Sequence, residues 1–247
     1  MDKIGILGYG YVGKATHKGI LKDAKAIIYD TMFDVDKSII YKADTVFICI
    51  PTNTDEDIKI IITEIKDLQE HTPGVKIIIR STLPLGACDK IQEEVGPIIY
   101  IPEFLRERYW DTDCLKRPLI IGCDVADFLP DWLYYQEEIH ECSTTEAELV
   151  KMFSNNFATM RIAFANVFYD LSNKVGSDYN NLKDMYFKVQ QDQTYMEVPG
   201  HDGTRGFGGK CLPKDLDFLI DTLDKHNIDQ NWFKHIRELN KGWKEKF

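Results

Sequence analysis

Short apolar runs alternate with amphipathic stretches along the first half of the chain, and this alternation limits the fold more than any other feature. The runs are rich in β-branched residues and are bounded by turn or polar residues, as is typical of buried strands. They are Ile4–Leu7, Ala26–Tyr29, Thr45–Ile50, Ile77–Ile79 and Ile98–Ile101, with Leu119–Ile121 as a further candidate. Helical patterns lie between them near residues 11–22, 55–71 and 86–94. This spacing predicts βαβ units, and therefore an α/β fold with a mostly parallel sheet.

The pattern changes after residue 143. Ser143 offers an N-cap and Glu146 an acidic first turn for a helix that we expect to run to Val175 and to end at Gly176. Shorter helices are predicted near residues 180–192, 213–226 and 229–245. We therefore expect two domains: residues 1–125 with the sheet, and residues 143–247, which are all-α.

Composition narrows the range of partners. The formal net charge of −10 argues against nucleic acid or an anionic membrane as a partner. No apolar run is long enough to span a membrane, and the polar N-terminus does not resemble a signal peptide, so we expect a cytoplasmic protein. The six cysteines are scattered, and no histidines stand at metal-ligand spacing. We expect reduced thiols and no metal site.

A glycine turn directly follows the first predicted strand. Gly8, Gly10 and Gly13 form a GxGxxG pattern that opens a helix. Such glycines allow a tight turn, close approach of a pyrophosphate, and close packing of the helix on the strand. The pyrophosphate would rest on the amides of Tyr11 and Val12, where the helix dipole favours an anion. The context predicts a Rossmann-type dinucleotide-binding domain; the alternative is an ordinary glycine turn.

Asp30 stands at the end of the second predicted strand. An acid at this position can accept hydrogen bonds from a ribose 2′-hydroxyl and would repel a 2′-phosphate. We therefore expect the cofactor to be NAD in preference to NADP. If the glycine turn is not a cofactor site, Asp30 is a surface acid.

The most informative segment surrounds Cys211. Three glycines in the four positions 206–209 let the backbone approach a ligand closely, and Pro213 suits the first turn of a helix. Cys211 would then lie just before that helix, where the helix dipole and the neighbouring Lys210 and Lys214 favour a nucleophilic thiolate. The alternative is a buried structural cysteine beside a glycine turn.

Taken together, six segments of the chain resemble the UDP-glucose/GDP-mannose dehydrogenase family. The segments are Gly8–Gly13, Ile50–Thr52, Arg80–Gly86, Pro102–Glu107, Ala147–Asn155 and Gly206–Asp215. The resemblance implies a four-electron oxidation of the C6 alcohol of a nucleotide sugar, with UDP-glucose to UDP-glucuronate as the first candidate. It implies that Cys211 holds the intermediate, first as a thiohemiacetal and then as a thioester, while two NAD are reduced.

The resemblance also implies roles for other residues. Lys151 and Asn155, one helical turn apart, would stabilise the oxyanion. Thr82 and Asp215 would hold the catalytic water. The remaining implied positions are Glu103 and Glu107 for proton handling and hydrolysis; Thr52, Thr82, Glu107 and Lys214 near NAD; and Phe104, Leu105, Lys151, Asn155 and Gly208 near the sugar nucleotide.

Arg205 carries a guanidinium fork suited to phosphate, in a polar glycine-rich stretch that begins at residue 199. Relatives of this family continue into another Rossmann-like domain that binds the nucleotide, whereas this chain ends at Phe247. From this difference we expect a chain that lacks the C-terminal UDP-binding domain and that discriminates poorly between bases.

An aromatic-rich stripe runs along the predicted 144–175 helix through Phe153, Phe157, Met160, Phe164 and Phe168. Such a stripe is often core, yet the resemblance implies that this helix builds a homodimer interface. Two other functions remain open. One is a hydroxyacid or 6-phosphogluconate type of dehydrogenase, which transfers a single hydride and needs no Cys211. The other is a non-catalytic NAD-binding module.

Overall fold

The computed structural model describes residues 2–52, 54–116, 118–136, 138–189, 197–200, 202–225 and 229–244. The chain divides into two compact units, Met1–Lys151 and Met152–Phe247, and each is described by itself. This division falls within one helix, α5 (Thr144–Lys174). The domain limits drawn from the sequence stay a prediction.

The first unit is built on a seven-stranded sheet in the order β2-β1-β3-β4-β5-β6-β7. Its strands are β1 (Ile4–Leu7), β2 (Ile27–Tyr29), β3 (Thr45–Ile48), β4 (Lys76–Ile79), β5 (Ile99–Tyr100), β6 (Leu119–Gly122) and β7 (Ile139–Cys142). All neighbours pair in parallel except β5 and β6, which confirms the mostly parallel sheet. Because β2 and β3 lie on opposite sides of β1, the chain reverses direction there, and such a switch point forms a ligand-binding crevice in α/β sheets.

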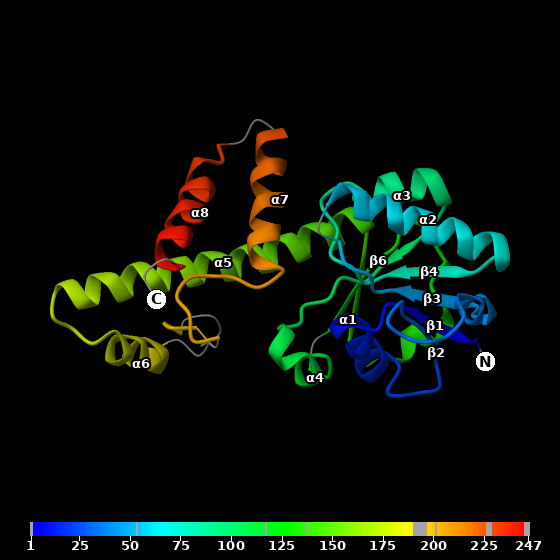
Figure 1. Ribbon diagram of the computed structural model, residues 1–247, viewed down its shortest axis with the longest axis horizontal. Coiled ribbons are helices and arrows are strands. Elements are labelled where there is room, and N and C mark those ends of the chain that lie inside the picture. The colour runs from blue at the N-terminus through cyan, green and yellow to red at the C-terminus, as the bar shows by residue number, and fades with distance from the viewer. Residues whose placement is uncertain are drawn as a thin grey trace. The chain divides into compact units, whose positions relative to one another are not determined.

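Helices cover both faces of this sheet. They are α1 (Tyr11–Ala15), α2 (Asp55–His71), α3 (Ala87–Val95) and α4 (Trp110–Asp113), and α2 and α3 lie on the face opposite α1 (Figure 1). Alternate residues of each strand face opposite sides, so Val46 packs in the core beneath α2 and α3 while Phe47 packs in the core beside α1. A π-helical turn at Thr16–Ile20 continues α1, and short 3₁₀ turns occupy Lys37–Lys42, Glu107–Tyr109 and Asp131–Tyr135.

The start of α5 is anchored within the first unit. Ser143 and Glu146 form the predicted N-terminal box, in which the Ser143 amide donates to the Glu146 carboxylate (2.9 Å) and the Glu146 amide donates to the Ser143 hydroxyl (3.2 Å). Glu148, two residues after Glu146, accepts hydrogen bonds from the amides of Gly86 and Cys88 at the start of α3, both at 2.7 Å. Burial raises the pKa of Glu148, and these two amides oppose that rise. These hydrogen bonds fix the first turns of α5 in this unit, and they therefore also fix the position of Lys151, three residues after Glu148.

In the second unit, the described elements are all helical. They are the remainder of α5, then α6 (Tyr179–Val189), α7 (Leu212–Lys225) and α8 (Asn231–Lys244). α7 and α8 lie side by side (Figure 1) and share an apolar core with the middle of α5. Phe207, from the glycine loop, is buried in that core. The ends of three predicted helices, at residues 190–192, 226 and 245, lie outside the described residues.

Two features of the first unit were not predicted. The sequence of β7 lacks the apolar run of a buried strand, because His140 and Glu141 in its centre are exposed, as is common for an edge strand. The helix expected over residues 11–22 is α-helical only to Ala15 and then changes to the π-helical turn. Among the described residues, no helix is long and apolar enough to cross a membrane.

Candidate active site

The glycine turn after β1 has the geometry that a dinucleotide requires. Gly8 has φ of +91°, and its amide donates to the Tyr29 carbonyl at 2.8 Å. A Cβ on Gly13 would lie 2.1 Å from the Gly8 carbonyl oxygen, so the helix can pack this closely only because residue 13 is glycine. A Cβ on Gly10 would meet nothing within 4 Å, so space is open where a pyrophosphate would approach the first amides of α1. The turn therefore fits the phosphate end of NAD.

Asp30 follows β2 directly, as predicted, and its carboxylate is held at this turn. One oxygen accepts from the Tyr9 amide (2.6 Å) and the other from the Met32 amide (2.9 Å). Each carboxylate oxygen has a second lone pair, so the group can still accept from ribose hydroxyls. This arrangement fits the ribose of NAD.

Replacing Asp30 with alanine is expected to weaken the preference for NAD over NADP. The substitution removes both the acceptor for the 2′-hydroxyl and the charge that repels a 2′-phosphate. Titration of both cofactors with wild-type and variant chains measures the ratio of their dissociation constants. A ratio that stays the same would show that Asp30 does not contact the ribose. Asp34→Ala, an exposed acid in the same loop, is the matched control.

Thr52 and Thr82 are brought together at the ends of β3 and β4. The Thr52 hydroxyl donates to the Thr82 carbonyl at 2.6 Å, and both residues are buried. The family resemblance implies that Thr52 contacts the cofactor and that Thr82 contacts the cofactor and the catalytic water. The two residues come from separate segments of the chain, and they are neighbours in the structure. Their roles toward ligands stay a prediction.

Glu103 and Lys151 form a buried ion pair. The Lys151 ammonium lies 3.0 Å from Glu103 Oε1 and also donates to the Glu103 carbonyl at 2.5 Å. Lys151 is 1% exposed and Glu103 5% exposed. Burial raises the pKa of Glu103, but the nearby Lys151, the Leu105 amide and Arg80 outweigh it, so the net pKa is lowered. The carboxylate is therefore held in its charged form. The family resemblance implies separate roles for these two residues, and their direct contact was not predicted.

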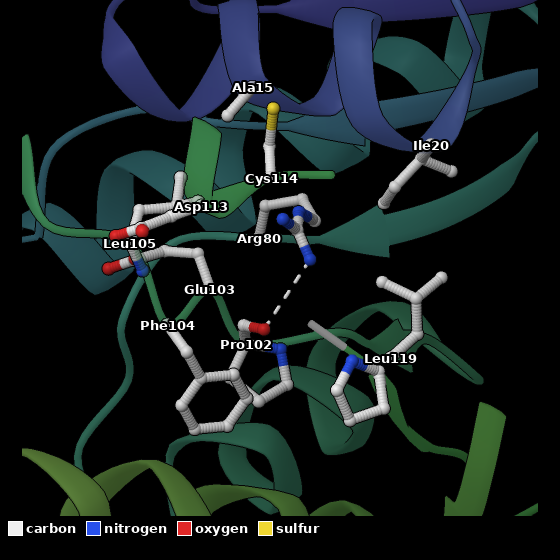
Figure 2. A pocket seen from close by; sticks show the side chains of 11 residues that line it. Ala15, Ile20, Arg80, Pro102, Glu103, Phe104, Leu105, Asp113, Cys114 and Leu119 are labelled. Atoms are coloured by element: carbon white, nitrogen blue, oxygen red, sulfur yellow. Dashed lines mark hydrogen bonds between the residues drawn. The ribbon is translucent and has the colours of Figure 1, made fainter. Parts of the chain in front are cut away.

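Glu103 also lines a pocket (Figure 2). It is lined by Ala15, Ile20, Arg80, Pro102, Glu103, Phe104, Leu105, Asp113, Cys114, Pro118 and Leu119. The buried Arg80 guanidinium donates to the carbonyls of Ile101 (2.9 Å) and Pro102 (3.4 Å), which fixes the start of the 103–107 segment. Arg80 belongs to one of the family segments, but its structural role could not be read from the sequence.

The other end of the 103–107 segment is held by Arg106. Its guanidinium forms a two-point contact with Asp113, at 2.9 and 2.7 Å, and the Arg106 amide donates to the same carboxylate. Glu107 follows at the start of the Glu107–Tyr109 turn and is exposed, unlike Glu103. The two predicted acids thus lie in different environments, one paired and buried and the other open to solvent.

Cys211 lies immediately before α7, as predicted. Its carbonyl accepts from the Asp215 amide at 2.8 Å, the first hydrogen bond of the helix, so Cys211 occupies the N-cap position. The thiol is reduced and the residue is partly exposed. This position places it at the positive end of the helix dipole.

The remaining five cysteines lie outside the glycine loop, in the first unit. Burial raises the pKa of Cys49 to about 11 and that of Cys88 well above its ordinary value. Burial also raises the pKa of Cys114, Cys123 and Cys142, although these three are partly exposed.

Asp215 lies one turn into α7 and is 2% exposed. The Asn155 amide donates to its Oδ2, so two predicted site residues are in direct contact in the second unit. Asp215 Oδ1 lies 3.7 Å from the Lys214 ammonium, yet it has no hydrogen-bond partner in the described part of the chain. A buried carboxylate oxygen without a hydrogen bond is costly, and a water or ligand hydroxyl would satisfy it. This geometry fits the water-holding role expected of Asp215.

Arg205 and Gly208 lie on the same loop in different settings. Arg205 is 5% exposed; its guanidinium donates to the side chain and carbonyl of Asn166 at 3.3 and 3.4 Å and stacks over Tyr169. Binding a phosphate would require it to exchange some of these contacts. A Cβ on Gly208 would lie 3.0 Å from the Lys244 ammonium, so a cation lies beside this glycine. Lys244 was not predicted, since the resemblance ended before α8.

Comparison with known proteins shows to which protein family the chain belongs. Residues 29–127 match the NAD binding domain of the UDP-glucose/GDP-mannose dehydrogenase family, and residues 145–242 match the central domain of the same family. The chain belongs to the UDP-glucose/GDP-mannose dehydrogenase family. The match confirms both the resemblance and the NAD-binding domain that the glycine turn predicted.

Individual members of the family are similar over most of the chain. A UDP-glucose 6-dehydrogenase of Campylobacter jejuni is 30% identical over 222 residues, which is 83% of this chain and 54% of that protein. A UDP-glucose 6-dehydrogenase of Rickettsia conorii is 31% identical over 216 residues, or 81% of this chain and 49% of that protein. The chain thus spans about half the length of the curated relatives it matches.

Solved structures share the fold. A UDP-glucose dehydrogenase from Pyrobaculum islandicum superposes with a TM-score of 0.78 at 22% identity, over 98% of this chain and 68% of that one. A 3-hydroxyisobutyrate dehydrogenase of Mycobacterium tuberculosis superposes with a TM-score of 0.74 at 17% identity, over 98% of this chain and 93% of that one. The fold is therefore common to two kinds of dehydrogenase, and only the site residues can separate them.

Proposed function

We propose that this protein is an NAD-dependent dehydrogenase that oxidises the C6 alcohol of a nucleotide sugar to a carboxylate, with UDP-glucose as the first candidate. The observation that carries the proposal is the start of α7, where Cys211 occupies the N-cap and Asp215 presents a buried carboxylate oxygen without a hydrogen bond. This pair lies in the family's cysteine segment, and a dehydrogenase that transfers a single hydride would not need Cys211.

The proposed chemistry uses the thiol to retain the half-oxidised sugar. NAD, bound at the glycine turn, supplies the acceptor for each hydride. The Cys211 thiolate adds to the aldehyde carbon, and the resulting oxyanion takes up a proton to give a thiohemiacetal. Its oxidation gives a thioester, and attack of water releases the carboxylate and restores the thiol. Asp215 would hold the attacking water through its open oxygen, together with Thr82.

Residues of both units would provide charge and ligand contacts. Lys151, whose ammonium lies 3.0 Å from Glu103 Oε1, would stabilise the oxyanion with Asn155, which lies four residues further along α5. Glu107 would handle protons at the exposed end of the segment. Thr52 and Lys214 would contact the cofactor. The proposed contacts to the sugar nucleotide are Phe104, Leu105, Arg205 and Gly208.

The exposed aromatic residues of α5 support a homodimer. Phe153, Phe157 and Phe164 are 73%, 54% and 57% exposed, and the rings of Phe153 and Phe157 stack at 6.0 Å. Aromatic side chains gathered on one exposed helix face are typical of an interaction surface. Met160 and Phe168, from the same predicted stripe, instead pack against the cores of the second unit. The six cysteines are not paired with one another in the structure, which is compatible with a reducing compartment such as the cytosol, where we place the protein.

Stoichiometry tests the proposed reaction. With UDP-glucose, and with GDP-mannose as a comparison, the 247-residue chain is expected to form two NADH for each sugar consumed, without free aldehyde in solution. The reason is that the thiol holds the intermediate between the two oxidations. NADH absorbance, sugar-acid quantification and an aldehyde-trapping reagent measure the three quantities. One NADH per sugar together with trapped aldehyde would instead indicate the single-hydride type of dehydrogenase.

A further inference from the structure

The loop that carries Cys211 runs from Phe207 to the start of α7, and its residues Gly208 and Gly209 have no side chains that could hold it in place. Gly208 and Gly209 follow Phe207, and Gly209 has φ of +73°, a conformation that favours glycine. Neither glycine has a side chain that could pack in a core. The position of the thiol therefore depends on the start of α7 at one end and on Phe207 at the other.

Asn240, on α8, holds the backbone of Phe207. Its side-chain oxygen accepts from the Phe207 amide at 2.7 Å, and its side-chain nitrogen donates to the Phe207 carbonyl at 2.9 Å. Asn240 is 7% exposed, so these two bonds form out of contact with bulk water. The side chain thus pairs with Phe207 as a neighbouring strand would, from a helix that starts 20 residues after Cys211.

Two further contacts make this arrangement specific. Gly206 has φ of +76°, and a Cβ there would lie 2.3 Å from the Asn240 side-chain oxygen, so this approach requires glycine. On the other side, the Asn166 side-chain oxygen accepts from the Gly206 amide at 3.3 Å. The Phe207 ring is buried with Leu216 and Trp243 in the core of the second unit. Asn240 therefore completes a clamp around residues 206 and 207.

We propose that Asn240 is a positioning residue that sets the place of the Cys211 thiol by holding the backbone of Phe207. The proposal rests on the proposed function, in which Cys211 is the nucleophile. Asn240 itself touches neither the thiol nor, in our assignment, any ligand. A primary amide offers one acceptor and one donor side by side, which is what the two backbone groups of Phe207 require.

The variant Asn240→Asp keeps the shape of the side chain but loses the donor. At pH 8 its carboxylate would face the Phe207 carbonyl oxygen, so the hydrogen bond to that carbonyl is lost. We expect kcat for NADH formation to fall by as much as about 10²-fold, the size of effect that a displacement of about 1 Å at a reacting group produces. The KM for NAD should stay within about twofold, because the glycine turn and Asp30, which would hold the phosphates and ribose of NAD, lie in the first unit. The exposed Asn231→Asp on the same helix is the matched control and should leave both constants unchanged.

Hydrogen exchange in the wild-type chain tests the clamp without any variant. The Phe207 amide should exchange as slowly as amides in the middle of α8, because its acceptor is the buried side-chain oxygen of Asn240. Exchange of the wild-type amide at the rate of an open loop would overturn the proposal, as would a folded Asn240→Asp chain with unchanged kcat. If Cys211→Ala retains turnover, the proposed function fails instead, and the exchange result still reports whether Asn240 holds the loop.

Discussion

Cys211→Ala is expected to abolish formation of the sugar acid while leaving NAD binding nearly intact. The substitution removes the only atom that we assign to covalent capture of the aldehyde. The cofactor contacts at Gly8, Gly10 and Asp30 belong to the first unit and do not depend on this side chain. Turnover is measured as sugar acid formed, and NAD affinity by direct titration. Removing a covalent nucleophile is expected to reduce turnover by several orders of magnitude.

Cys123→Ala is the matched control for this experiment. Cys123 is also a reduced and partly exposed cysteine, and its thiol donates to the Val125 carbonyl at 3.4 Å. Its loss should leave turnover close to that of the wild-type chain. If Cys211→Ala retained a tenth of wild-type turnover, the covalent mechanism would be wrong and the single-hydride type of dehydrogenase would gain support.

Lys151→Met is expected to be the most destabilising of the substitutions considered. It removes one partner of a buried ion pair and leaves the Glu103 carboxylate buried without its cation. Loss of one partner from such a pair typically costs about 3–5 kcal/mol of the free energy of unfolding. Urea unfolding of both chains measures this difference. Lys59→Met, which breaks an exposed pair with Glu56, is the control and should have little effect.

The pH dependence of this effect has a definite sign. Because the folded-state pKa of Glu103 is lowered from 4.5, its pairing stabilises the fold above that pH and is lost as the pH falls through the lowered value. In Lys151→Met the carboxyl can take up a proton without breaking a pair. The difference in stability between the two chains should therefore be largest near neutral pH and should narrow below about pH 4.5. A difference under about 1 kcal/mol at neutral pH would mean that the pair contributes little.

Local patterns predicted much of the fold. The turn at Gly8–Gly13, the N-cap at Ser143 and the position of Cys211 before α7 each depend on a few neighbouring residues, and all three are present in the structure. The edge strand β7 was missed because strand patterns depend on apolar alternation, which an exposed edge does not need.

Long-range partners could not be predicted in the same way. Glu103 and Lys151 are separated by 48 residues, and no spacing rule links them. Phe207 and Asn240 are separated by 33 residues, and Asn240 lies beyond the segments that carried the resemblance. The polar surroundings of Arg205 in the sequence predict that it is available for phosphate, whereas in the structure it is buried against Asn166 and Tyr169 of α5. Tertiary packing decides these contacts.

The environments of the six cysteines have a practical consequence for chemical labelling. Electrophilic reagents attack the thiolate, so a raised pKa slows their reaction at neutral pH. Burial raises the pKa of all five cysteines outside the glycine loop, and two of them, Cys49 and Cys88, are also out of reach of solvent. Cys211 alone combines partial exposure with a helix N-terminus. Because a helix N-terminus favours a thiolate, we expect an electrophilic reporter to react at Cys211 faster than at the three other partly exposed cysteines of the unmodified sequence.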